Sequence, residues 1–104
     1  MADRRSSVLS TKPIEHIVHQ GEIFQLRHPL AVEMSLERGV FGCEYPALGI
    51  IAYGNSEEEA LKDFASHFAY VWHEFAMAPD SDLTPGARKL KTAIQAMVAS
   101  VGRP

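Results

Sequence analysis

The chain of 104 residues has a single cysteine, Cys43, and no excess of positive charge. One cysteine cannot form an internal disulfide, which fits a reducing compartment, so we expect a cytoplasmic protein. The net charge is −3, so the basic field that would bind nucleic acid directly is lacking and no such binding is predicted. No apolar run approaches the roughly 20 residues that cross a bilayer, and no apolar segment follows Arg4 and Arg5 as a signal peptide requires. We therefore expect no membrane association.

Motifs for catalysis and cofactor binding are also lacking. The glycines do not have the spacing of a dinucleotide-binding or phosphate-binding loop, and no nucleophile lies beside a base in a recognisable local pattern. Of the five histidines, His16 and His19 are three residues apart and His67 and His73 six apart. A metal-binding pair on a helix has a spacing of three or four residues and a third ligand nearby, and no group of His, Cys and carboxylate residues here shows ligand spacing on a common element. We predict a protein that is not an enzyme and holds no metal or cofactor, and a metal-dependent hydrolase built on the histidines is the least favoured class.

What the chain does contain is an ordinary globular composition, with 46% hydrophobic and 22% charged residues. Residues 1–13 are polar and without period, so we expect a flexible tail there and a single domain over residues 14–104. Phe24 and Leu26 alternate with polar residues, which favours a short strand.

Two strands and their pairing can be predicted from alternation alone. Apolar residues recur at every second position in Leu30–Glu37 and again in Val40–Tyr45. The register that keeps apolar pairs on one face sets Met34 opposite Cys43 and therefore Glu33 opposite Glu44. A third strand is predicted at Leu48–Tyr53.

The helices follow from capping signals and apolar stripes. Ser56 and Glu59 form a capping box, and a long helix is predicted over Ser56–Ala76, packed across one face of the sheet. A second helix is predicted to start at Thr84 and Pro85 and to reach Val101. The fold class is thus α+β: a three- to four-stranded antiparallel sheet with a long helix on one face and a second, C-terminal helix.

Two surfaces are candidate partner interfaces. The first is the solvent side of the sheet, where Glu33 faces Glu44 and Glu37 is nearby; facing like charges are destabilising, so either an internal cation such as Arg27 relieves them or a basic partner docks there. The second is one flank of the long helix. This flank comprises His67, Tyr70 and Glu74, following Asp63, and it is either an ordinary solvated face or an interface edge.

The segments Tyr45–Gly49 and Ala52–Leu61 carry a family resemblance. They comprise a strand ending in Tyr-Pro, a Leu-Gly turn, a short strand ending in Gly, and a Ser-x-x-Glu helix start. In this pattern Leu30 to about Tyr70 resembles the HicB-type antitoxin family. The resemblance implies a partial ribonuclease-H-like fold that binds and silences a small basic RNA-cleaving toxin. The chain departs from that family in two expected features: the helix to Val101 replaces the strand that usually follows the long helix, and no separate DNA-binding segment follows.

Two function classes therefore stand. One is a non-enzymatic protein of antitoxin type with a protein partner. The other is a free-standing homo-oligomeric domain of the same fold with a structural or regulatory role. A small basic reading frame next to the gene would favour the first.

Overall fold

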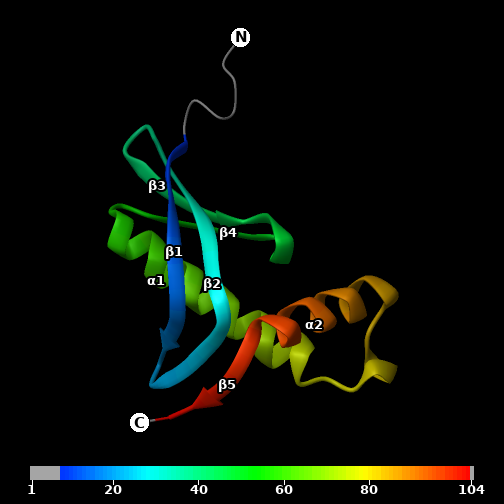
Figure 1. The fold of residues 1–104 in the computed structure, drawn as a ribbon. Helices are drawn as coiled ribbons and strands as arrows, with labels where there is room; N and C mark the ends of the chain where they lie inside the picture. Colours follow the sequence, from blue (N-terminus) through cyan, green and yellow to red (C-terminus); the bar gives the residue numbers. More distant parts are fainter. Residues whose placement is uncertain (1–7, 104) are drawn as a thin grey trace.

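The computed structural model describes residues 8–103 and shows an α+β fold, which confirms the predicted class. A five-stranded antiparallel sheet carries the long helix α1 on one face, and α2 packs beside the end of α1 (Figure 1). The strands are β1 (Val8–His19), β2 (Glu22–Glu37), β3 (Val40–Tyr45), β4 (Ile50–Gly54) and β5 (Val98–Gly102). The helices are α1 (Glu57–Val71), α2 (Pro85–Met97) and the short η2 (Pro46–Leu48), η3 (Trp72–Ala76) and η4 (Asp80–Asp82).

The β2–β3 hairpin has the predicted register. Met34 is the partner of Cys43 and Glu33 the partner of Glu44. The turn residues Arg38 and Gly39 have φ values of 51° and 80°, as a two-residue type I′ turn requires. Arginine is not preferred at the first turn position, so the pairing of the flanking strands decides the turn.

The N-terminal region corrects the expected tail. Val8–Pro13 belong to β1, which pairs along β2, for example Lys12 with Val32; residues 1–7 of the predicted tail lie outside the described residues. Apolar and polar residues do not alternate regularly in β1. It is an edge strand with two irregularities in its register and with Lys12 and Pro13 in its middle. The strand expected around Phe24 and the one at Leu30–Glu37 are a single strand, β2.

The C-terminal region corrects the expected long helix. α2 begins as predicted, with the Thr84 side chain accepting a hydrogen bond from the Ala87 amide, but it ends at Met97. The next five residues form β5, in which Val101 is the partner of Phe24. Val98 and Val101 fit both a helical stripe and a strand, and pairing with β2 decides between them. The expected absence of a strand after the helices is therefore wrong.

The core lies between the sheet and α1. Phe24, Phe64 and Phe68 are fully buried, and the Phe24 ring meets Phe68 edge to face at 5.4 Å between centroids. α1 starts at the predicted cap, where Ser56 Oγ accepts a hydrogen bond from the Glu59 amide at 3.1 Å. Its last turns continue as the π-helical η3. The apolar side chains on the face of the β2–β3 hairpin toward α1 differ in exposure. Val32, Met34 and Cys43 are buried, Phe41 and Tyr45 are half-buried, and Leu36, next to the hairpin turn, is 39% exposed.

Candidate functional site

The sheet face opposite α1, here called the outer face, brings together the three glutamates of the first predicted interface. Glu33 and Glu37 lie on β2 and Glu44 on β3, and the alternation that buries Met34 and Cys43 turns all three away from the core. Glu44 is half-buried and has an interaction partner of its own. Glu33 and Glu37 are therefore the exposed carboxylates of the outer face.

Apolar side chains stand among these carboxylates. Ile51 on β4 is the partner of Glu44, and Tyr53 is the partner of Gly42. Their exposed fractions are 43% and 60%, and that of Val40 is 42%. The Tyr53 ring lies 3.8 Å from the position that a Cβ on Gly42 would occupy, so the absence of a side chain at Gly42 leaves room beside the ring. This apolar part of the outer face could not be predicted from the sequence. β4 has apolar residues on both faces, so its pattern does not show which of them are exposed.

Arg27 does not relieve the acidic pair. It lies six residues before Glu33 on the same strand, about 20 Å away at 3.3 Å per residue. Within residues 8–103 it forms no ion pair with the outer-face glutamates. The acidic character of the outer face is therefore not cancelled from within by that arginine.

The second predicted interface, the helix flank, meets the outer face at the edge of β4. Asp63, at the start of the flank, accepts a hydrogen bond from the Tyr53 amide at 3.0 Å and lies 3.5 Å from His67 Nε2. Tyr70 is 61% exposed, and Glu74 follows on η3. A surface hollow of about 540 Å³ spans the junction, lined by Val40 and Tyr53 on one side and by residues of α1 on the other. The two predicted surfaces are thus neighbours, which the sequence did not show.

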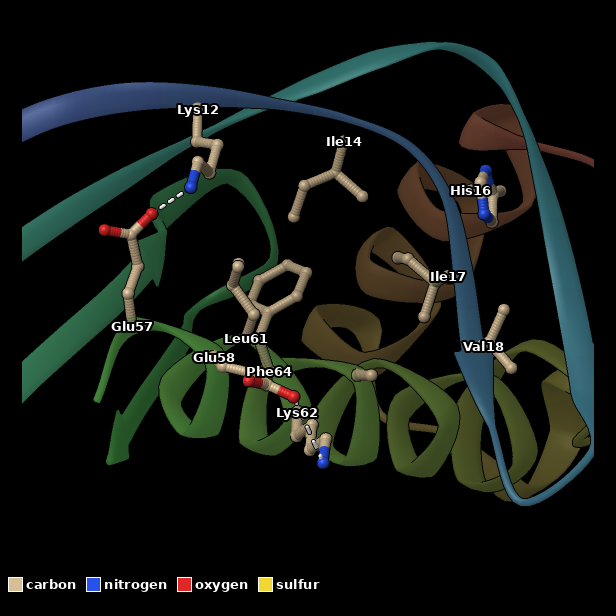
Figure 2. Close-up of a pocket in the computed structure, with 11 residues that line it drawn as sticks. Lys12, Ile14, His16, Ile17, Val18, Glu57, Glu58, Leu61, Lys62 and Phe64 are labelled. Carbon is tan, nitrogen blue, oxygen red and sulfur yellow. Dashed lines mark hydrogen bonds and ion pairs between the residues drawn. The ribbon is translucent and has the colours of Figure 1, made fainter. Parts of the chain in front are cut away.

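A groove that the sequence did not predict lies between β1 and α1 (Figure 2). It has a volume of about 530 Å³, and its apolar lining is formed by Ile14, Ile17, Leu61, Phe64 and Ala65. The Lys12 ammonium pairs with the Glu57 carboxylate at one end. Residues up to Pro13 were expected to form a tail, so only the spacing of Ile14 and Ile17 could have indicated this groove.

The free edge of β1 above this groove is protected against another strand. Pro13 has no amide hydrogen to donate, and Lys12 and the register irregularities interrupt the edge. Lysine, proline and bulges on an edge strand are common devices against strand addition. At the opposite edge, the Tyr53 amide of β4 is already occupied by Asp63. Neither edge therefore offers a continuous template for pairing.

Two titratable groups among residues 8–103 have a shifted pKa, Cys43 and Asp80. Burial raises the pKa of the Cys43 thiol to about 11, so it stays protonated at neutral pH and is a poor nucleophile. Within residues 8–103, no three side chains of the His, Cys, Asp and Glu types are placed to hold a metal. The Lys91 ammonium, 2.8 Å from Asp80, lowers the pKa of that carboxyl, and this pair joins η4 to α2.

Comparisons with known proteins give no relative: no family model, no curated protein and no solved structure matches the chain. In the part of the chain that the structure describes, no helix is both long enough and apolar enough to span a membrane.

Proposed function

We propose that the chain is a non-enzymatic, partner-binding protein of antitoxin type, which binds and neutralises a small basic RNA-cleaving toxin. The observation that carries the proposal is the outer face: exposed Glu33 and Glu37 beside exposed Val40, Ile51 and Tyr53. The resemblance of Tyr45–Leu61 to the HicB-type family supplies the class of partner.

The composition of the outer face suits a protein partner with positive charge. Interfaces combine an apolar and often aromatic centre with a polar rim, and tyrosine is enriched among the residues that contribute most to binding. Tyr53 and Ile51 would supply that centre. Carboxylates at the rim would raise the association rate with a cationic protein and fix its orientation.

The test is co-expression with the product of a small basic reading frame next to the gene. We expect the two proteins to co-purify and RNA cleavage by the partner to be suppressed. Tyr53→Ala should weaken the complex, and the double variant Glu33→Lys with Glu37→Lys should weaken it more than Tyr53→Ala does. Asp82→Lys, which changes an exposed charge on η4, is the matched control and should have no effect. A folded chain that neither binds this product nor suppresses its activity would contradict the proposal.

The second candidate is a free-standing homo-oligomer with a structural or regulatory role. Exposed Ile51 and Tyr53 would also suit a self-interface. A two-fold contact through the outer face, however, would bring Glu33 and Glu37 of both copies together, which is unfavourable. Light scattering after size-exclusion chromatography separates the candidates, because a Tyr53-dependent oligomer without a partner would favour the second.

A further inference from the structure

The β1–β2 turn and the end of β5 lie side by side at one end of the molecule (Figure 1). A pocket with several polar side chains in its lining lies there. Its volume is about 340 Å³. Its lining shares no residue with the groove beneath β1 and includes Tyr70 of the helix flank. Its polar lining includes His19 from β1, Glu22 from β2, Tyr70 from α1, His73 from η3 and Arg103 after β5.

The fold brings these side chains together from distant parts of the sequence. His19 and Glu22 are partners across the first turn, where Gln20 and Gly21 both have positive φ. Gly102 is the partner of Ile23, so Arg103 leaves the sheet at the level of Glu22. The π-helical η3 carries His73 to Glu22, with 2.7 Å between Nε2 and Oε1. Single π-helical turns within α-helices are frequent at functional sites.

The charges of the pocket leave basic groups without an acidic partner. Among the described residues of the lining, Glu22 is the one carboxylate; its side chain is 12% exposed and lies within hydrogen-bond distance of His73. Within residues 8–103, no carboxylate pairs with His19 or Arg103. Arg103, His19 and Tyr70 all line the pocket, and all three side chains can donate hydrogen bonds.

We propose that this pocket binds the phosphate group of a small phosphomonoester. The planar Arg103 guanidinium can donate hydrogen bonds to two phosphate oxygens at once. His19 and Tyr70 would donate hydrogen bonds to the remaining phosphate oxygen. The volume is at the low end of the range for small-molecule sites. The exposed Tyr70 ring gives the organic part of the ligand a surface to pack on. The proposal is independent of the outer face and of the proposed toxin partner.

The histidine ring signals in NMR spectra test it on the intact chain. Inorganic phosphate, AMP and adenosine are titrated separately at constant pH and ionic strength, with chloride as the compensating ion. Phosphate and AMP should shift the His19 and His73 signals with a saturable, millimolar dissociation constant, and adenosine should not. His16, His28 and His67 lie outside the pocket, so the chemical shifts of their ring signals should not change.

Variants complete the test. Arg103→Gln should weaken phosphate binding roughly tenfold or more, because a hydrogen bond between charged groups is lost. Arg27→Gln removes an exposed arginine on β2 outside the pocket and should leave binding unchanged. Absence of saturation, parallel shifts of all five histidines, equal binding of adenosine and AMP, or unchanged affinity in Arg103→Gln would each overturn the proposal.

Discussion

Phe68→Ala removes a ring from the centre of the core and tests how α1 is fixed to the sheet. Phe68 is 0% exposed, and its ring contacts Phe24 edge to face at 5.4 Å and Phe64 at 6.4 Å between centroids. Truncating a buried phenylalanine costs about 3–5 kcal/mol, and loss of the aromatic pairs is part of that cost. A domain has only about 5–15 kcal/mol in total, so the variant should be close to unfolding.

Urea unfolding followed by circular dichroism measures the effect. With a slope of about 1–3 kcal/mol per M, the midpoint should fall by roughly 1–5 M. Tyr70→Ala is the matched control: it truncates an aromatic residue two positions along the same helix, but the side chain is 61% exposed. We expect a change within about 0.5 kcal/mol for this control. Equal shifts in the two variants would refute the assignment of Phe68 to the core.

Three further predictions concern backbone approach, capping and ionisation. Gly54→Ala should destabilise by about 1–3 kcal/mol or more, since a Cβ would lie 2.4 Å from the backbone nitrogen of Ala60; Gly86→Ala has open space and should raise the thermal midpoint slightly. Ser56→Ala should cost about 1 kcal/mol in the same thermal measurement, and an unchanged midpoint would show that the cap is unimportant. The pKa of Cys43 rises from 9.0 to about 11 on folding, so the unfolded chain ionises first. Stability should be intact below pH 9 and fall toward pH 11 by up to about 1.4 kcal/mol per pH unit, and the loss should be smaller in Cys43→Ala; identical pH profiles would contradict this.

The sequence predicted the parts of the fold in which local pattern and tertiary packing agree. Strict alternation in Leu30–Glu37 and Val40–Tyr45 fixed the register, because any shift by one residue would bury glutamates. The cap at Ser56 and the aromatic stripe of α1 fixed the long helix. These elements follow from the periodicity of one segment or from the comparison of two neighbouring segments.

The rest depended on contacts distant in sequence. β1 contains Lys12 and Pro13, and its polar pattern is that of an edge strand covered on one side. β5 is helical by pattern, and its pairing with Phe24 and neighbouring residues makes it a strand. Short segments with such mixed patterns take the structure that their partners allow.

The candidate interface also has one part that followed from local sequence pattern and another that depended on contacts distant in sequence. The pairing of Glu33 with Glu44 followed from register and is confirmed. The apolar centre around Tyr53 and its junction with the helix flank through Asp63 required the position of β4 beside α1. Binding by these surfaces remains a prediction.

The association rate of the chain with the small basic partner, measured as a function of ionic strength, distinguishes the outer face from the helix flank as the binding surface. We expect Glu33→Lys with Glu37→Lys to slow association about tenfold or more at low salt and to weaken its salt dependence, while the fold is unchanged. Unchanged kinetics in this variant, together with slower binding when His67, Tyr70 and Glu74 are replaced, would show that the interface lies on the helix flank and not on the outer face.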